Sequence, residues 1–244
     1  MKLAVIPARG GSKRIPRKNI KLFGGKPMIA WSIAAALKSA CFDSVIVSTD
    51  DEEIADIARL HGAEVPFMRP VSLSDDYTGT IPVIRHAIEW LSINRQTPTQ
   101  VCCIYATAPF LNPLDIRQGL TVLESTASDY AFSTTSYAFP IQRAIRVNAQ
   151  GKVAMFLPEH ANTRSQDLEH AYHDAAQFYW GQAQAWISGK VIFGANSAAL
   201  HIPRYRAQDI DTMEDWEMAE YLFFAMNLER ESDHNLPNRN QNDV

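Results

Sequence analysis

The sequence is organised around LAVIPARGGSKRIPRKNIK, residues 3–21, where a short apolar run leads directly into a basic loop. The apolar run at residues 3–6 is typical of a buried β-strand. Six of the 13 residues from Arg9 to Lys21 are Lys or Arg and none is acidic, although the whole chain carries a formal charge of −4. Gly10 and Gly11 have no Cβ, so a ligand can approach their backbone N–H groups closely. A strand, a basic glycine-containing loop and a following helix together predict a phosphate-binding site, and a nucleoside triphosphate is the ligand that we expect.

The basic loop does not follow the two common nucleotide-binding patterns. It is neither a GxGxxG loop nor a GxxxxGK[ST] loop. Basic loops are also frequent on solvated protein surfaces, so residue chemistry alone leaves that alternative open.

Length and composition suit one domain of moderate size, or one domain with an arm. The 244 residues are 46% hydrophobic and 20% charged, so a sizeable core can form. We expect one domain over residues 1–228 and a disordered polar tail over residues 229–244. The acidic net charge argues against general nucleic-acid binding. We expect a cytoplasmic protein for three reasons. The three cysteines lack metal-ligand spacing, no segment is long enough to span a membrane, and the N-terminal apolar run is too short for a signal peptide.

The first half of the chain alternates between strand-like and helix-like patterns. We expect strands at residues 3–6, 45–47, 64–67, 101–105 and 130–133, and helices that begin near Pro27, span 52–60 and 81–93, and begin at Asn112-Pro113. This alternation predicts an α/β fold, a doubly wound and mostly parallel sheet with helices on both faces. Ligands bind at the carboxyl ends of the strands in such sheets.

The second half of the chain is less regular. Residues 140–173 interrupt the alternation with two short β-like runs, 144–147 and 153–157, around a turn-rich segment, and predict a projecting arm. Residues 177–180, 185–188 and 198–203 have the pattern of returning strands. A helix with one strongly apolar side is expected from Met213 to about Leu228.

Residues 7–19, PARGGSKRIPRKN, closely resemble the signature of the cytidylyltransferases that activate acidic nine-carbon and eight-carbon sugars. The CMP-sialic acid synthetases are the best-known members of this family. The resemblance extends over about residues 1–226. It implies a Rossmann-like nucleotidyltransferase fold, a homodimer built with the projecting arm, and a reaction that joins CMP from CTP to an acidic nonulosonic sugar and releases pyrophosphate.

The resemblance also implies which residues contact the nucleotide. Arg9 and Lys13 match catalytic residues that hold the departing pyrophosphate. Thr80 lies near a further nucleotide contact of the family, although a helix N-cap is an equally good interpretation of this threonine. The full set expected at the nucleotide is Ala8, Arg9, Gly10, Ser12, Lys13, Lys18, Asn19, Arg69 and Thr80.

A pair of alternating acids, Asp209 and Asp211, is the candidate metal site. Alternate residues of an extended segment point the same way, so the two carboxylates can share one cation. Carboxylate oxygens suit Mg²⁺, which keeps several waters and bridges phosphates. Acids ahead of a helix also interact favourably with its dipole, which is the competing interpretation. The Asp-Ile-Asp run matches the metal motif of the family, and the resemblance makes Asp211 a catalytic carboxylate.

Two further segments are candidates for sugar recognition. The first, YATAPF at residues 105–110, follows a strand where sialic-acid-activating relatives carry Gln-Pro-Thr-Ser-Pro. The second, DAAQFYWG at residues 174–181, has three consecutive aromatic residues, which are typical either of a sugar pocket or of a buried strand. Together the segments are most similar to the branch of the family that activates pseudaminic acid. The expected sugar contacts are Tyr105, Thr107, Gln166, Asp174, Gln177 and Tyr179.

Other functions fit the sequence less well. Sialic, legionaminic or octulosonic acid are the alternative sugars within the family. A nucleotide-binding module without catalytic activity is the alternative from another class, and the presence of Lys13, Asp209 and Asp211 argues against it. A nicotinamide-dependent dehydrogenase is disfavoured because the loop lacks the dinucleotide glycine spacing.

Overall fold

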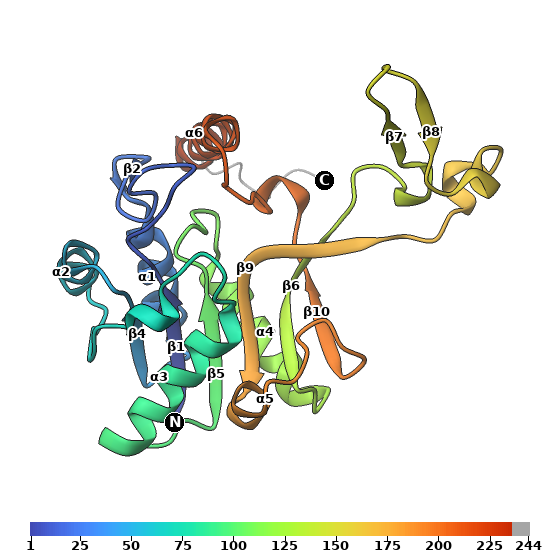
Figure 1. The fold of residues 1–244 in the computed structure, drawn as a ribbon. Helices are drawn as coiled ribbons and strands as arrows, with labels where there is room; N and C mark the ends of the chain where they lie inside the picture. Colours follow the sequence, from blue (N-terminus) through green and yellow to red (C-terminus); the bar gives the residue numbers. More distant parts are fainter. Residues whose placement is uncertain (236–244) are drawn as a thin grey trace, which may run out of the picture.

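The protein is built on one six-stranded sheet, in the strand order β10-β6-β9-β5-β1-β4 (Figure 1). A computed structural model describes residues 1–235 and the side chains of residues 1–226. The strands of this sheet are β1 (Lys2–Pro7), β4 (Ser44–Ser48), β5 (Gln100–Ile104), β6 (Tyr130–Ser136), β9 (Tyr172–Gln182) and β10 (Ser197–His201). Two small hairpins pair β2 (Leu22–Phe23) with β3 (Lys26–Pro27) and β7 (Ile145–Val147) with β8 (Val153–Met155).

The α-helices are α1 (Met28–Ser39), α2 (Glu52–Leu60), α3 (Thr80–Asn94), α4 (Pro113–Ser125), α5 (Ala183–Ser188) and α6 (Met213–Asn235). Short 3-10 helices are η1 (Val71–Leu73), η2 (Ile141–Arg143), η3 (Pro158–His160), η4 (Ser165–Asp167) and η5 (Arg204–Arg206). In the described residues no helix combines the length and the apolar character that crossing a bilayer requires.

The mostly parallel sheet expected from the alternation is confirmed. β1 pairs in parallel with β4 and β5, and β10 pairs in parallel with β6. β9 is the exception, since it runs antiparallel to both of its neighbours, β5 and β6. The parallel strands therefore end at one edge of the sheet, and the loops that follow them meet there.

Alternate residues of the strands supply two separate hydrophobic layers, because side chains alternate between the faces of a sheet. Ala4 and Ile6 belong to the layer that includes residues of α1, α2 and α4. Leu3 and Val5 belong to the layer that includes residues of α3 and α5. A third cluster beneath α6 contains Trp216, which packs edge-on against Phe23.

Two expected strands are corrected by the structure. Residues 64–67 do not form the expected strand. Glu64 makes an isolated bridge to Ile46 of β4, and the next bridge joins Met68 to Thr49. Pro66, between them, has no N–H to donate to a ladder. Residues 185–188 belong to helix α5, which ends at Gly189 in the left-handed region, at φ 70°. Alanine and glutamine favour a helix here, and the glycine caps it. The cap and first turn expected at Asn112-Pro113 are confirmed, since the Asn112 side chain accepts a hydrogen bond from the N–H of Leu114.

The projecting arm extends from the sheet between the end of β6 and the start of β9 (Figure 1). Its outer part is the β7-β8 hairpin, which turns through Gly151 at φ 74°. At the other end of the chain, α6 continues to Asn235 rather than ending near Leu228. Glu229, Arg230 and Glu231 are good helix formers and allow this extension. Residues 236–244 of the expected tail lie outside the described residues.

The basic loop is held against the start of α2 by Arg17, which pairs with both Asp51 and Glu53. Arg17, whose φ of 56° lies in the left-handed region, donates from its two terminal nitrogens to the carboxylate of Asp51 at 2.5 and 3.1 Å. The same carboxylate accepts a hydrogen bond from the N–H of Ile54 at 3.0 Å and so caps α2. Asn19 closes the loop internally, since its side-chain amide donates to the carbonyl of Arg9 at 2.9 Å.

Replacing Asp51 with Asn should therefore destabilise the protein in a pH-dependent way. Hydrogen bonding from Arg17 lowers the pKa of Asp51, so the carboxylate stabilises the fold above its unfolded pKa and loses that effect as the pH falls. Asparagine caps a helix as well as aspartate does, so Asp51→Asn removes mainly the partly exposed ion pair, worth about 1 kcal/mol. Urea unfolding should show this loss near neutral pH, and the difference from wild type should shrink as the pH falls through about 4.

The control for this measurement is Asp56→Asn, on the same helix, because Asp56 forms an exposed surface pair with Arg59 at 2.9 Å. The stability of this variant should match that of wild type at neutral pH and at acidic pH. An equal loss of stability in Asp51→Asn at neutral and acidic pH would contradict the assignment.

Candidate functional site

A cavity of about 520 Å³ lies where the loops after β1 and β5 approach the segment before α6. Nine of the residues predicted for the site line it, and they come from four parts of the chain: Arg9, Ser12, Lys13, Lys18, Asn19, Thr80, Tyr105, Thr107 and Asp211. Residues far apart in the sequence therefore line one cavity. A volume of this size is typical of small-molecule sites.

One wall of the cavity carries two cations that share a single carboxylate. Arg9 donates to Asp76 Oδ1 at 2.6 Å and to the carbonyl of Asp75 at 2.8 Å, and Lys13 donates to Asp76 Oδ2. The hydrogen bonds from Lys13 and then Arg9 lower the pKa of Asp76. Sequence reasoning missed Asp76, because an acidic pair in a loop gives no sign of a partner 63 residues away.

Another wall is formed by Asp211, which also holds two cations. Arg14 lies 2.9 Å from Asp211 Oδ2, and Lys18 Nζ lies 3.3 Å from Oδ1. Lys18 also donates to the carbonyl of Ile210 at 2.7 Å, which ties the basic loop to a segment 192 residues further along the chain. Asp215 accepts a hydrogen bond from the N–H of Asp211 at 3.1 Å and so fixes the backbone of this segment.

Asp209 and Asp211 supply oxygen donors suited to Mg²⁺. Asp209 is an exposed residue and, unlike Asp211, is not among the residues that line the cavity. Desolvation by neighbouring atoms, followed by the negative charge of Asp211, raises the pKa of Asp209. Among the side chains of residues 1–226, Asp209 makes no salt bridge. The described residues contain no cluster of three or more His, Cys, Asp or Glu side chains able to hold a metal. A pair of carboxylates nevertheless fits Mg²⁺, because this ion takes its remaining ligands from water and phosphate oxygens.

Three residues predicted at the nucleotide, Ala8, Gly10 and Arg69, are not among the residues that line the cavity. Ala8 is buried, and its N–H donates to the carbonyl of Ser48 at 2.9 Å. Gly10 donates its N–H to Asp50 Oδ1 at 3.0 Å. Arg69 is 6% exposed and has a terminal nitrogen 3.6 Å from the same Asp50 oxygen, and its burial lowers its pKa. Asp50 therefore connects Arg69 to the basic loop.

Thr80 is the first residue of α3, and Gly79 occupies the N-cap position. The N-cap interpretation of Thr80 is therefore wrong by one residue. The threonine side chain belongs to the cavity wall together with Tyr105.

The structure places only some of the predicted sugar contacts at the cavity. Tyr105 and Thr107 line the cavity. Gln166 is an exposed residue of η4, within the arm. Gln177 is 2% exposed and donates from its amide nitrogen to the carbonyl of Arg206 at 2.5 Å, behind the cavity wall.

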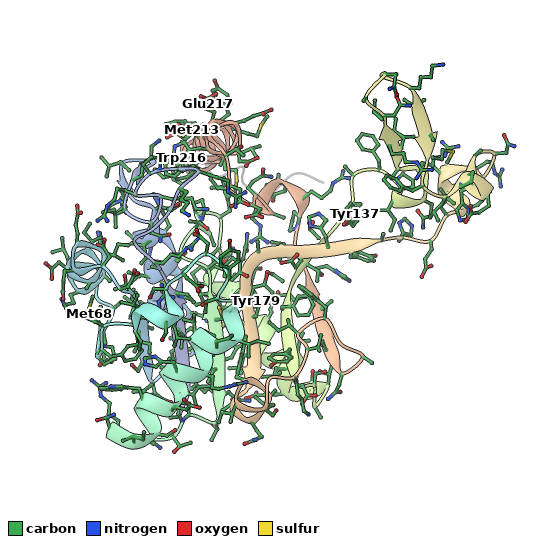
Figure 2. All side chains as sticks on the ribbon, in the orientation of Figure 1. Met68, Tyr137, Tyr179, Met213, Trp216 and Glu217 are labelled. Atoms are coloured by element: carbon green, nitrogen blue, oxygen red, sulfur yellow. The ribbon has the colours of Figure 1, made fainter. Side chains whose placement is uncertain are left out.

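The aromatic run of β9 contributes to the core rather than to the cavity. Phe178 and Trp180 are fully buried in the layer shared with α4, and Trp180 donates its ring N–H to the carbonyl of Ile116 at 2.9 Å. Tyr179, labelled in Figure 2, belongs to the opposite layer. It is 2% exposed and donates its hydroxyl proton to Asp174. The buried-strand interpretation therefore holds for all three rings.

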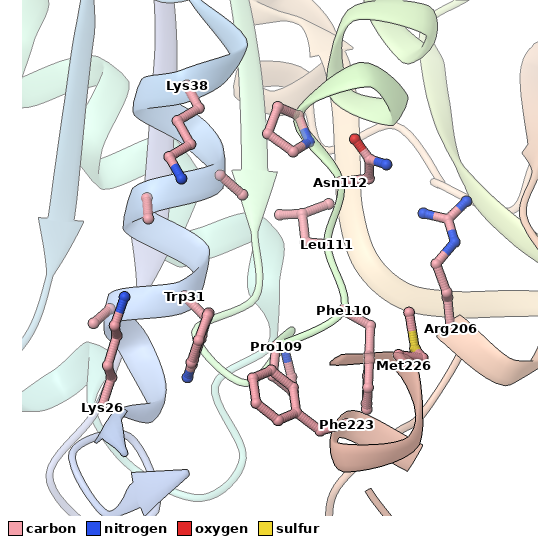
Figure 3. A pocket seen from close by; sticks show the side chains of 14 residues that line it. Lys26, Trp31, Lys38, Pro109, Phe110, Leu111, Asn112, Arg206, Phe223 and Met226 are labelled. Carbon is pink, nitrogen blue, oxygen red and sulfur yellow. The ribbon is translucent and has the colours of Figure 1, made fainter. Parts of the chain in front are cut away.

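A second cavity, of about 240 Å³, lies between α1, the loop after β5 and α6 (Figure 3). Its wall includes the rings of Trp31, Phe110 and Phe223. Arg206 also reaches this cavity, but its guanidinium is already paired with Asp115. None of the predicted site residues lines this second cavity, so the chemistry suggested by the sequence belongs to the first.

Comparison with known proteins gives close relatives over nearly the whole chain. The pseudaminic acid cytidylyltransferase of Campylobacter jejuni (strain 81-176) is 47% identical over 221 residues, which are 91% of this chain and 95% of the relative. The CMP-N,N'-diacetyllegionaminic acid synthase of Legionella pneumophila is 34% identical over 230 residues, 90% of this chain and 95% of that protein.

A solved structure supports the fold. CMP:2-keto-3-deoxy-manno-octonic acid synthetase complexed with CTP superimposes with a TM-score of 0.69 at 17% identity, covering 92% of this chain and 99% of the other. The family model described as Cytidylyltransferase matches residues 3–231, a range that includes the basic loop, the cavity and the Asp-Ile-Asp segment. On this evidence, the chain belongs to the cytidylyltransferase family.

Proposed function

We propose that the protein transfers CMP from CTP to the anomeric hydroxyl of an acidic nonulosonic sugar and releases pyrophosphate. The observation that carries this proposal is the carboxylate of Asp76, which binds Arg9 and Lys13 together on the wall of the main cavity. Two cations that bind one carboxylate can also bind phosphate oxygens, since a carboxylate and a phosphate both accept charge-assisted hydrogen bonds. The triphosphate would take the place of Asp76 at these two side chains.

The proposed reaction is a direct displacement at the α-phosphorus. The anomeric oxygen forms a bond to this phosphorus, the bond to the bridging oxygen of the leaving pyrophosphate breaks, and the hydroxyl proton is released. Such a reaction depends on positioning and on stabilisation of charge more than on covalent chemistry by the protein. Arg9 and Lys13 would stabilise the negative charge that develops on pyrophosphate.

Magnesium is part of this proposal, with Asp209 and Asp211 as its protein ligands. A bound Mg²⁺ would supply neutralisation of phosphate charge and a lower pKa for a coordinated hydroxyl. Arg14 and Lys18 hold the oxygens of Asp211. They would pair with phosphate oxygens once Asp211 takes on its role as a ligand.

We propose pseudaminic acid as the preferred sugar. Its support is the Campylobacter jejuni relative of that name, at 47% identity, and the phenol of Tyr105 on the cavity wall. Pseudaminic acid has a methyl group at C9 where sialic acid has a hydroxylated carbon. A phenol at this position offers more apolar surface than the glutamine of sialic-acid-activating relatives.

The protein is further proposed to act as a homodimer that uses the arm as its interface. The arm and its base expose large apolar side chains, among them Phe139 (82% exposed), Val153 (65%) and Phe156 (60%). Clustered apolar exposure of this kind is typical of protein–protein contacts. A symmetric pair would bury two copies of the same surface.

A sugar panel tests the reaction and its specificity. Pyrophosphate release from CTP and Mg²⁺ would be measured with pseudaminic, legionaminic, N-acetylneuraminic and octulosonic acids. Because burying a hydroxyl without a partner costs roughly 1–3 kcal/mol, pseudaminic acid should show a kcat/KM at least about tenfold above that of N-acetylneuraminic acid. Equal use of N-acetylneuraminic acid would remove the pseudaminic assignment, whereas no release with any of the four sugars would remove the proposed reaction.

The metal assignment predicts that Asp211→Asn keeps the fold and loses at least about a hundredfold in kcat at saturating Mg²⁺, since it removes a charged ligand with little change of shape. Asp209→Asn should have the same or a milder effect. Glu214→Gln is the matched control, because Glu214 is an exposed acid in the first turn of α6 and lines neither cavity. Comparable turnover by Asp211→Asn and wild type would exclude the carboxylate as a ligand.

Because Asp76 is shared by Arg9 and Lys13, substitutions of Lys13 and of Asp76 should have opposite effects on CTP. Lys13→Ala should cost about 2–4 kcal/mol of transition-state stabilisation, measured as kcat/KM for CTP. Asp76→Asn removes the anion that competes with the triphosphate, so the Kd of CTP should fall by about three- to tenfold in calorimetry. Asp56→Asn controls for the change in net charge. Weaker CTP binding by Asp76→Asn would show that this carboxylate supports the nucleotide instead of competing with it.

A further inference from the structure

Gln177 is a buried residue of β9 that forms hydrogen bonds to two separate segments of the chain. Its backbone carbonyl accepts a hydrogen bond from the N–H of Tyr105 at 2.9 Å. Its side-chain amide nitrogen donates to the carbonyl of Arg206 at 2.5 Å. A carbonyl oxygen can only accept, so this contact requires the nitrogen of the amide rather than its oxygen. One residue therefore joins the segment after β5 to the segment before α6, and each of these segments contributes to the main cavity.

An irregularity in β9 lets this residue reach both segments. Phe132 of β6 faces Tyr179 and Thr134 faces Asp174, so β9 advances five residues while β6 advances two. Ala176, inside this bulge, has φ 50° in the left-handed region. A bulge re-aims the side chains beside it, and the amide of the next residue meets a carbonyl of η5, outside the sheet.

The Tyr105 backbone is held from two directions. In addition to the contact with the Gln177 carbonyl, the hydroxyl of Ser32, a fully buried residue of α1, donates to the carbonyl of Tyr105 at 2.7 Å. Both polar groups of this backbone are thus bonded to β9 or to α1. Because Tyr105 and Thr107 line the cavity, this side of the link to Gln177 is a fixed wall.

The segment before α6 is the less regular of the two. Arg206 is the last residue of η5, and residues 207–212 follow it outside any helix or strand. Arg206 is held at two points, since its guanidinium pairs with Asp115 of α4 and its carbonyl accepts from Gln177. The Asp-Ile-Asp run lies a few residues further on. The Gln177 amide therefore anchors the backbone at the start of the segment that carries the two candidate metal ligands.

We infer that Gln177 is a positioning residue that sets where the Asp-Ile-Asp segment lies relative to the wall that carries Tyr105. This inference rests on the proposed function and deepens it, because Tyr105 belongs to the sugar side of the proposed transfer and the two carboxylates belong to the metal side. The attacking hydroxyl must be aligned with the α-phosphorus, and a misplacement of about 1 Å can cost on the order of a hundredfold in rate. A residue bonded to both sides fixes their separation.

Stability alone does not account for a glutamine at this position. The Oε1 atom of Gln177 is buried and has no hydrogen-bond partner among the described residues. A buried polar atom without a partner costs at least as much stability as one ordinary hydrogen bond contributes. A methionine of similar length would avoid this cost, so the melting temperature of Gln177→Met should stay close to that of wild type.

Steady-state kinetics of Gln177→Met, measured for the full-length enzyme with the best sugar of the panel, test the inference. The variant lacks the donor to the Arg206 carbonyl, so kcat should fall about tenfold through loss of alignment. The KM for CTP should stay within about twofold, because the basic loop keeps Arg9 and Lys13.

Gln182→Met is the matched control. It makes the same substitution at the far end of β9, at the N-cap position of α5, where the glutamine side chain makes no capping hydrogen bond. Gln182 is not among the residues that line the cavity, so kcat and both KM values should not change.

The pH profile of Gln177→Glu separates positioning from a purely structural role. A protonated carboxyl can donate to the Arg206 carbonyl as the amide does, whereas an ionised carboxylate can only accept. Burial raises the pKa of a carboxyl. The kcat of this variant, divided by that of wild type at each pH, should therefore be highest at acidic pH and fall about tenfold as the pH rises through the raised pKa of the introduced carboxyl.

Hydrogen exchange gives a readout that needs neither sugar nor metal. In the unliganded protein, the backbone amides of residues 207–212 should exchange about three- to tenfold faster in Gln177→Met than in wild type, because the segment loses the anchor at its start. The amides of β1 and β4 should exchange as in wild type. Gln182→Met should match wild type over residues 207–212.

The outcomes distinguish this inference from the proposed function. A wild-type protein that uses none of the four sugars would overturn the function, and unchanged exchange of residues 207–212 in Gln177→Met would overturn the inference whatever the activity. With an active wild type, an unchanged kcat of Gln177→Met or a flat relative pH profile of Gln177→Glu would overturn the inference alone. If Gln177→Met did not fold, the pH profile of Gln177→Glu would decide the question.

Discussion

The basic loop depends on acidic partners from other parts of the chain. Six cations within 13 residues repel one another, and the fold brings carboxylates to them from three directions. Asp51 at the start of α2 pairs with Arg17, Asp76 pairs with Arg9 and Lys13, and Asp211 pairs with Arg14 and Lys18. The first loop of the protein is therefore folded by contacts with residues 34 to 193 positions away.

These ion pairs differ in whether a bound ligand could replace the carboxylate partner. The Arg17–Asp51 pair lies outside the cavity lining and also caps a helix, so it belongs to the permanent structure. Asp76 and Asp211 lie on the cavity wall, and their cationic partners can exchange a carboxylate for a phosphate oxygen. Four cations and two carboxylates line this cavity, so it keeps a net positive charge before its ligand binds. Each cation nevertheless has a carboxylate partner until a phosphate replaces it, which avoids the cost of burying unpaired cations.

β9 is the strand that makes the sheet mixed rather than fully parallel. Because it enters antiparallel between β5 and β6, the chain can leave the sheet for the arm after β6 and return along β9 without a crossover helix. Its bulge interrupts the pairing with β6 at the level of Tyr105, where a regular ladder would have continued. The strand therefore serves as core through Phe178 and Trp180, and as support for the cavity wall through Gln177.

The sequence by itself determined the features of this protein that depend on neighbouring residues. The apolar run of β1, the strand–helix alternation of the first half, the cap at Asn112, and the concentration of charge at residues 9–21 are local patterns, and the structure has all of them. The family motif further indicated the nucleotide loop and the Asp-Ile-Asp segment. The two strands that were wrongly expected also failed for local reasons. Pro66 interrupts residues 64–67, and helix-favouring residues with the Gly189 cap make residues 185–188 part of α5.

Only the tertiary structure decided which charges meet and which rings are buried. No local pattern pairs Asp76 with Lys13, because this contact depends on the path of the chain between them. Three consecutive aromatic residues fit a pocket or a core equally well, and the layers packed on either face of β9 made them core. The bulge that joins Asp174 to Tyr179 likewise arises from the register between β6 and β9. Register is a relation between two strands, so neither strand's sequence contains it alone.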